Sequence, residues 1–189
     1  MKTGNTASGT FYVFNKKEQS IPIVFIHGVG LTYEIWQPQL DFFKNYSNLS
    51  YDILGHGKSS LTKKNISFDD FSDQLIELIN ELKIDKIHLV GFSIGSLIAR
   101  NFATKYNDRL QSLILLGSIY KRSEQQQEIV NQRFEQAKKE LKLSRQALNR
   151  WFTDKYLENN PGTYEKISSI LLGNNMVNFL KVYELFVKH

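Results

Sequence analysis

The sequence predicts an α/β protein with a mostly parallel sheet flanked by helices and followed by a helical segment. Up to about residue 120, short apolar runs alternate with stretches whose apolar residues recur at helical spacing, as in strand-helix-strand units. From Lys121 onward such runs stop, and charged, glutamine-rich amphipathic segments follow. We therefore expect residues 1–120 to form the sheet region, and residues 121–189 to form a helical cap over it.

The strands expected in the first region are nearly continuous apolar runs, as strands buried on both faces are. They are 21–28 (IPIVFIHG), 49–54 (LSYDIL), 86–91 (KIHLVG) and 111–120 (QSLILLGSIY). The intervening periodic segments predict helices over 33–46, 67–84 and 93–106. The helix over 67–84 has a start signal, since Ser67 is followed by Asp69 and Asp70.

The region after Lys121 is expected to be helical, with breaks at 159–162 (NNPG) and 173–175 (GNN). Its last segment, 176–189, shows one apolar face at helical spacing. That face consists of Met176, Phe179, Leu180, Tyr183, Phe186 and Val187.

Length and composition indicate one globular domain, alone or with an inserted helical lid: 189 residues, 41% hydrophobic and 23% charged. The sequence has no cysteine, which excludes disulfides and thiolate metal sites and fits a reducing compartment. No stretch is apolar enough for a signal peptide or a membrane span, so we expect a cytoplasmic protein without a membrane partner. The net charge of +5 comes from scattered lysines, which argues against nucleic-acid binding and leaves the oligomeric state open.

The segment Gly91-Phe92-Ser93-Ile94-Gly95 matches the pattern G-x-S-x-G between an expected strand and an expected helix. In that context a sharp turn exposes the serine hydroxyl, and flanking glycines leave room for it. Ser93 is therefore a candidate nucleophile, and the amide of Ile94 a candidate donor to an oxyanion. The alternative is a glycine-rich turn with a serine helix cap.

A second turn, His27-Gly28-Val29-Gly30, follows the first buried strand. A glycine turn at this place could present the amide of Val29 to the same oxyanion, with His27 and Gly28 as structural support. The alternative is a simple turn after a strand.

Three motifs resemble the α/β-hydrolase family, specifically its esterase and lactonase branch, and are similar to those of 3-oxoadipate enol-lactonase-like hydrolases. They are HGVGLTYEIW (27–36), DILGHGKS (52–59) and GFSIGSLIARNFA (91–103). The resemblance covers about 20–189 and implies a Ser93 nucleophile, Val29 and Ile94 as oxyanion donors, and a cap at 121–189. Relatives that are dehalogenases or epoxide hydrolases use aspartate at the elbow, so Ser93 argues against both. No metal or organic cofactor is implied.

A serine needs a histidine base, and in this family an acid and then the histidine follow the serine in the chain. The only histidine after Ser93 is His189, at the end of an amphipathic segment. His27 and His56 lie in turns, and His88 lies in the strand before the serine, so each is expected to be structural.

The catalytic acid is also missing, because the residues after the 111–120 strand contain no carboxylate before Glu124, and Asp154 fits a solvated helix face. The catalytic acid and histidine are therefore expected to be absent from this chain, which we predict to be a truncated N-terminal portion of a longer hydrolase. The strand 111–120 would then be an exposed apolar edge. Loss of the base alone can cost about a million-fold in turnover, so this portion is expected to be nearly inactive.

Three alternatives stay open beside a serine hydrolase of small carboxylic esters or lactones. The first is nucleotide binding, because residues 52–59 nearly match a phosphate-binding loop, although Asp52 replaces its first glycine. The second is a non-catalytic binder of apolar ligands, using the cap aromatics Trp151, Phe152, Tyr156 and Tyr183. The third is hydrolysis of a carbon-carbon bond on the same scaffold.

Overall fold

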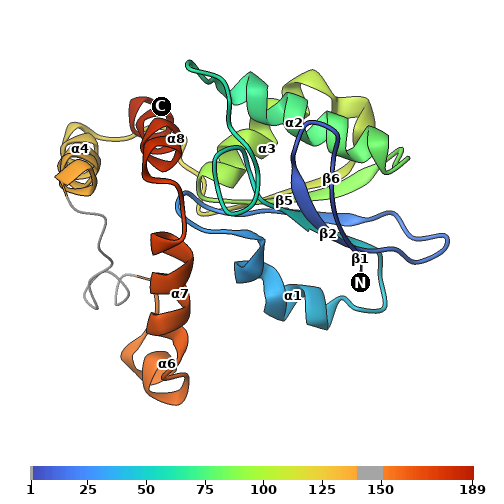
Figure 1. Ribbon diagram of the computed structural model, residues 1–189, viewed down its shortest axis with the longest axis horizontal. Coiled ribbons are helices and arrows are strands. Elements are labelled where there is room, and N and C mark those ends of the chain that lie inside the picture. The colour runs from blue at the N-terminus through green and yellow to red at the C-terminus, as the bar shows by residue number, and fades with distance from the viewer. Residues whose placement is uncertain (1, 140–150) are drawn as a thin grey trace.

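A six-stranded mixed sheet lies at the centre of the computed structural model, which describes residues 2–139 and 151–189 (Figure 1). Its strands are β1 (Lys2–Asn5), β2 (Phe11–Asn15), β3 (Ile23–Ile26), β4 (Asn48–Tyr51), β5 (Ile87–Phe92) and β6 (Leu110–Leu116). Their order in the sheet is β1-β2-β4-β3-β5-β6. The last four are mutually parallel, while β2 pairs antiparallel with both β1 and β4. The predicted α/β class and the four strands expected from apolar runs are confirmed.

Strands β1 and β2 were not expected from the sequence. Strand β2 is a short apolar run, FYVFN, and is almost wholly buried, whereas β1 is the polar segment KTGN at the sheet edge. A polar edge strand forms because the backbone of β2 offers hydrogen-bonding partners, and composition alone does not signal this.

The first helical segment is shorter than the predicted 33–46 and divided in two. A 3₁₀ turn, η1 (Tyr33–Trp36), is capped by the Thr32 side chain and leads into α1 (Gln37–Phe42). Pro38 stands in the first turn of α1, where its missing N–H costs no intrahelical hydrogen bond.

Two longer helices, α2 (Phe68–Glu81) and α3 (Ile94–Lys105), cover one face of the sheet, and α1 lies on the other (Figure 1). Helix α2 begins with the expected signal, since Ser67 and Asp70 form a reciprocal capping box. After α3, a short 3₁₀ turn, η2 (Asn107–Arg109), leads into β6.

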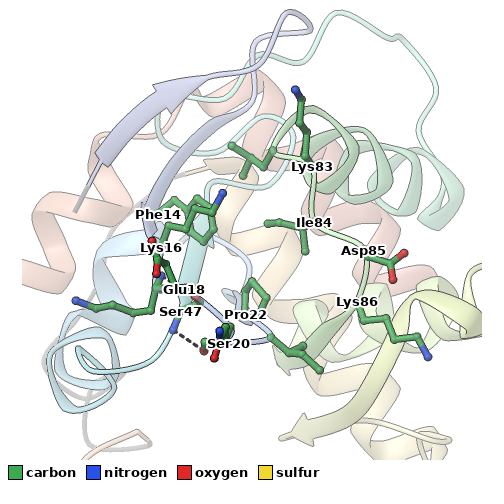
Figure 2. Close-up of a pocket in the computed structure, with 14 residues that line it drawn as sticks. Phe14, Lys16, Glu18, Ser20, Pro22, Ser47, Lys83, Ile84, Asp85 and Lys86 are labelled. Carbon is green, nitrogen blue, oxygen red and sulfur yellow. Dashed lines mark hydrogen bonds between the residues drawn. The ribbon is translucent and has the colours of Figure 1, made fainter.

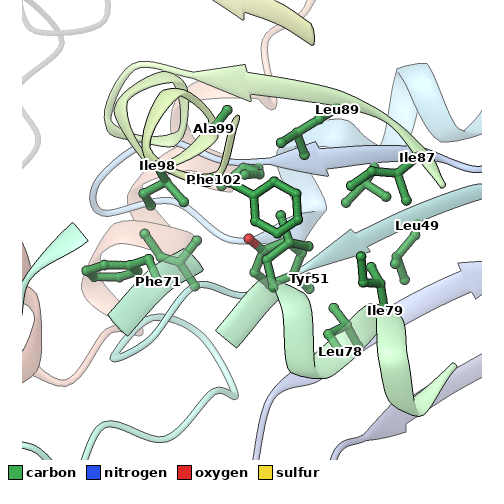
Figure 3. Close-up of a cluster of buried hydrophobic side chains, with 14 of the residues drawn as sticks. Leu49, Tyr51, Phe71, Leu78, Ile79, Ile87, Leu89, Ile98, Ala99 and Phe102 are labelled. Atoms are coloured by element: carbon green, nitrogen blue, oxygen red, sulfur yellow. The ribbon is translucent and has the colours of Figure 1, made fainter. Parts of the chain in front are cut away.

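The side chains of β3 alternate between two apolar clusters, one on each face of the sheet. Val24 and Ile26 join the main core beneath α2 and α3, and Phe25 packs with Trp36 and Leu40 on the α1 side. Figure 3 shows part of the main core, in which Tyr51, Phe71 and Phe102 lie among aliphatic side chains. This double-sided burial explains why β3 reads as a continuous apolar run.

The chain after Lys121 contains helices α4 (Glu124–Lys139), α6 (Asp154–Asn159), α7 (Thr163–Leu172) and α8 (Met176–Lys188) among its described residues. We call these the C-terminal helices. The predicted breaks at 159–162 and 173–175 separate α6 from α7 and α7 from α8. Residues 140–150 of the expected cap lie outside the described residues. Helix α8 packs against α4, where the rings of Phe134 and Tyr183 are 5.3 Å apart, and it inserts Val182 into the main core.

Strand β6 is the sheet edge beside β5 and is exposed along its apolar residues. Leu113, Ile114, Leu115 and Leu116 keep 37 to 45% of their surface accessible. Helix α3 lies against part of one face of the strand. The expected exposed apolar edge is therefore present.

Candidate active site

Ser93 stands in the turn between β5 and α3, with φ 55° and ψ −120°. A positive φ is unfavourable for a residue with a Cβ atom, so the surrounding packing must hold it. Two hydrogen bonds to the Ser93 main chain do so: the Ser93 N–H donates to Leu116 O at 2.9 Å, and the Ser93 carbonyl accepts from the side-chain hydroxyl of Ser96 at 2.5 Å. The Ser93 side chain is half-buried, and its hydroxyl makes no hydrogen bond within residues 2–139 and 151–189.

The glycines that flank Ser93 are required by close backbone packing. A Cβ atom on Gly91 would lie 2.2 Å from the carbonyl oxygen of Gly95, and one on Gly95 would lie 2.5 Å from that of Ile26. Both obstacles are backbone atoms, which side-chain motion cannot relieve. The start of α3 is thus pressed against the end of β3.

The turn after β3, residues 27–30, lies beside the 91–95 turn. Strands β3 and β5 are paired in parallel with Ile26 opposite Gly91, so both turns follow the carboxyl ends of neighbouring strands. A Cβ atom on Gly28 would meet the Phe92 ring at 3.2 Å, which shows how closely the two turns pack.

Two backbone amides of these turns are available as hydrogen-bond donors. The Ile94 N–H opens α3 and therefore has no acceptor within the helix, at an end where the helix dipole favours negative charge. The Val29 N–H has no backbone acceptor among the described residues. Both donors belong to the main chain, so the property does not depend on the side chains of Ile94, which is buried, and Val29, which is half-buried.

His27 is buried beside the turn, with both ring nitrogens engaged. Its Nε2 accepts from the Ile53 N–H at 3.1 Å, so Nδ1 carries the proton and donates to Gly28 O at 2.8 Å. Burial lowers the pKa of His27 to about 4. A neutral imidazole with two occupied nitrogens supports the turn and has no lone pair free to accept a proton from Ser93.

His56, in the loop after β4, also has hydrogen-bond partners at both ring nitrogens. Its Nε2 accepts from the Gly30 N–H at 2.8 Å, and Nδ1 lies 3.3 Å from Leu54 O. Burial, followed by repulsion from His27, lowers the pKa of His56 to about 3. His56 is therefore a neutral acceptor that fixes the backbone of the 27–30 turn.

Asn174, between α7 and α8, joins the 27–30 turn to the 52–59 loop. Its Nδ2 donates to Gly30 O at 3.0 Å, and its Oδ1 accepts from the Gly57 N–H at 3.1 Å. Asn174 is only 8% exposed. The sequence analysis treated 173–175 only as a helix break and missed this role; a doublet of asparagines at such a break is the only signal that could have drawn attention to it.

The loop 52–59 is organised by Asp52 rather than shaped for a phosphate. Its Oδ1 accepts from the Tyr33 N–H at 2.8 Å and its Oδ2 from the Lys58 N–H at 2.9 Å, while burial raises the pKa of the carboxyl. No helix follows before α2 at Phe68, in a segment that the structure describes throughout. A phosphate-binding loop needs a helix N-terminus and lacks a buried carboxylate, so the near-match in this sequence is misleading.

The remaining histidines lie apart from the two turns. His88 is near the start of β5, roughly 16 Å along the strand from Ser93, and its Nδ1 is 2.8 Å from the Ser112 hydroxyl. The ring of His189 packs against Phe68 at a centroid distance of 5.2 Å. Burial, followed by the nearby charges of Arg100 and Arg122, lowers the pKa of His189.

Two cavities of similar size lie at opposite ends of the parallel strands. One of about 390 Å³ is bordered by Lys16, Lys83 and Lys86, near where β3 and β5 begin (Figure 2). The other, of about 370 Å³, is lined by Phe92, the neighbour of Ser93, and by Trp36 and Trp151. Among the described residues, no cluster of three or more histidine or acidic side chains could hold a metal ion. No helix there is long and apolar enough to cross a bilayer.

Comparison with known proteins places this geometry in a family. The model for the alpha/beta hydrolase fold matches residues 21–153. The (E)-2-((N-methylformamido)methylene)succinate hydrolase of Acinetobacter baylyi is 33% identical, with 88% of this chain and 63% of that protein aligned. For 3-oxoadipate enol-lactonase 2 of the same organism the identity is 26%, over 77% of this chain and 55% of the relative. The chain thus spans less than two thirds of either relative.

A solved structure supports the fold independently. The enol-lactonase from Burkholderia xenovorans superposes with a TM-score of 0.82, covering 98% of this chain and 73% of that one. At 22% identity this likeness concerns the fold alone.

Proposed function

The chain belongs to the α/β-hydrolase fold family, and from this premise we propose that it carries the nucleophile and oxyanion site of a serine hydrolase acting on small carboxylic esters or lactones. Ser93 is the proposed nucleophile, and the amides of Val29 and Ile94 are the proposed oxyanion donors. Residues 121–189 are the proposed cap. The strained backbone of Ser93, fixed between β5 and α3, is the observation that supports the proposal most directly.

The reaction would begin with attack of the Ser93 oxygen on the carbonyl carbon of the substrate, with the hydroxyl proton passing to a base. The carbonyl oxygen becomes an oxyanion and accepts hydrogen bonds from the two amides. Collapse of the tetrahedral species expels the alcohol oxygen, which takes up the proton, and leaves an acyl-serine. Water then attacks the acyl group by the same steps and releases the acid.

The base and acid of this reaction are not assigned to any residue of the sheet region. His27 and His56 have both ring nitrogens occupied, and His88 lies far along β5. We propose that the base and acid come from outside these 189 residues. The chain alone is then expected to form the acyl-serine slowly, with only its oxyanion site contributing.

The test is acylation by p-nitrophenyl butyrate, followed by peptide mapping with mass spectrometry. An acyl group is expected on Ser93, and added imidazole should speed its formation by acting as an external base. Ser93→Ala should lose this adduct, while Ser169→Ala, which removes an exposed serine of α7, should retain it. Equal acylation of the wild-type and Ser93→Ala chains would refute the assignment.

A further inference from the structure

The cavity of about 370 Å³ beside Phe92 is lined mostly by apolar side chains, among them the rings of Trp36, Phe92, Trp151, Phe152 and Tyr156. One side comes from the sheet region, where Trp36 meets Phe92 edge-on at 6.5 Å. The other side comes from the C-terminal helices, where Phe152 and Tyr156 are stacked at 5.0 Å and 13°. Its volume falls within the range of about 300–1,000 Å³ that is usual for small-molecule sites. The aromatic and aliphatic side chains of this lining give the cavity an apolar surface against which an aromatic ring can pack.

The charge that the described lining carries is positive only. Among the described residues, Lys166 of α7 is the only charged side chain of the lining, and no carboxylate of residues 2–139 or 151–189 borders the cavity. Lys166 is exposed and forms no ion pair with another described residue. The cavity therefore favours a ligand with a negative group next to its apolar body.

A buried donor in the same lining also lacks a partner. The indole Nε1 of Trp36 is shielded from solvent and has no hydrogen-bond acceptor within residues 2–139 and 151–189. Leaving such a donor unsatisfied is unfavourable, and because this atom is covered by its neighbours, Trp36 contributes to the cavity through the apolar surface of its ring.

We propose that this cavity binds an aromatic ring that carries a carboxylate, with the ring against the aromatic side chains of the lining and the carboxylate at Lys166. Phe92 precedes the candidate nucleophile in the chain, and its ring packs against Gly28 of the 27–30 turn. The cavity therefore adjoins the candidate site, although Ser93, Val29 and Ile94 do not themselves line it. This inference rests on the proposed function and extends it: the substrates are esters or lactones whose non-reacting part is an aromatic carboxylate.

The chain supplies its own probe for this binding, because its two tryptophans, Trp36 and Trp151, both line the cavity. Titration with 3-phenylpropionate is expected to change the tryptophan emission to saturation, and calorimetry should give the same dissociation constant. The neutral 3-phenylpropionamide should bind at least about threefold more weakly, since it lacks the charge that Lys166 attracts.

Two matched variants locate the charge. Lys166→Met is expected to weaken 3-phenylpropionate binding about two- to fivefold and to leave the amide unaffected. Lys86→Met removes the same charge from the cavity at the other end of the parallel strands, and it should leave the binding of both the acid and the amide unchanged. Ser93→Ala should bind as the wild type does, so binding is tested separately from the nucleophile.

Several results would overturn the proposal: emission that does not saturate, equal affinity for the acid and the amide, or weakening by Lys86→Met instead of Lys166→Met. If binding follows the expected pattern while Ser93 fails to acylate, the ligand site stands and the proposed hydrolase function fails. The opposite pair of outcomes would retain the hydrolase and reject the aromatic carboxylate.

Discussion

Replacement of Asn174 by alanine tests whether this single side chain holds the 27–30 turn. The change removes two tertiary hydrogen bonds, from Nδ2 to Gly30 O and from the Gly57 N–H to Oδ1. The Gly30 carbonyl is then left in a buried setting without its donor. The unsatisfied buried carbonyl costs about 1–3 kcal/mol, and the lost bond to the N–H of Gly57, which is exposed, costs about 1 kcal/mol, so the free energy of unfolding should fall by about 2–4 kcal/mol.

Urea unfolding followed by tryptophan emission measures this loss. With an m-value of about 2 kcal/mol per molar, the midpoint should fall by about 1–2 M. The matched control is Asn159→Ala, which removes an exposed amide whose Nδ2 donates only to Lys155 O one turn earlier in α6. Its midpoint should move by less than about 0.3 M. Equal midpoints for the two variants would refute the reasoning that the Asn174 bridge stabilises the turn.

Three further predictions concern the same framework. Gly91→Ala should abolish the folded state or cost more than about 3 kcal/mol in urea unfolding, because its Cβ would meet the Gly95 carbonyl at 2.2 Å; an unchanged midpoint would contradict the contact. The pKa values of His27 and His56, about 4 and about 3, lie below the unfolded value of about 6.5. Below pH 6.5 the unfolded state therefore takes up protons first, and stability should fall by about 1–2 kcal/mol per histidine by pH 5; a flat profile between pH 6.5 and 4.5 would argue against neutral, buried rings. Ile114→Lys should reduce concentration-dependent self-association in light scattering, because it places a charge on the exposed edge strand β6; unchanged association would show that the edge is not the contact.

The inner strands were predictable because burial on both faces leaves a direct mark on the sequence. Strand β3 reads as a continuous apolar run since Val24 faces one helix layer and Phe25 the other. Strand β1 leaves no such mark, because its polar residues gain their structure only by pairing with β2. The predicted apolar face of α8 omitted Val182, which is fully buried, because the helix packs on α4 and on the sheet region at once. Helical spacing identifies a single face, and two packing partners widen it.

The candidate site also has one part that the sequence predicts and another that it does not. The turn around Ser93 was predictable because strand, glycines and helix all lie within a few consecutive residues. The bridge through Asn174 was not, since nothing in the local sequence indicates which distant backbone groups an amide will reach. His56 was assigned to its turn correctly, but its bond to the Gly30 N–H depends on how two loops meet.

The bridge from Asn174 to Gly30 also has a consequence for the order of events on the ribosome. The two residues are separated by 144 positions. At a synthesis rate of about 5–20 residues per second, the 27–30 turn is synthesised roughly 7 to 30 s before Asn174 is added. Within that interval His56, which is added 26 residues after Gly30, can accept from the Gly30 N–H, while the Gly30 carbonyl still lacks the donor that Asn174 provides. The final geometry of the turn is therefore a late product of translation, and a nascent chain stalled before residue 174 would carry an unfinished site.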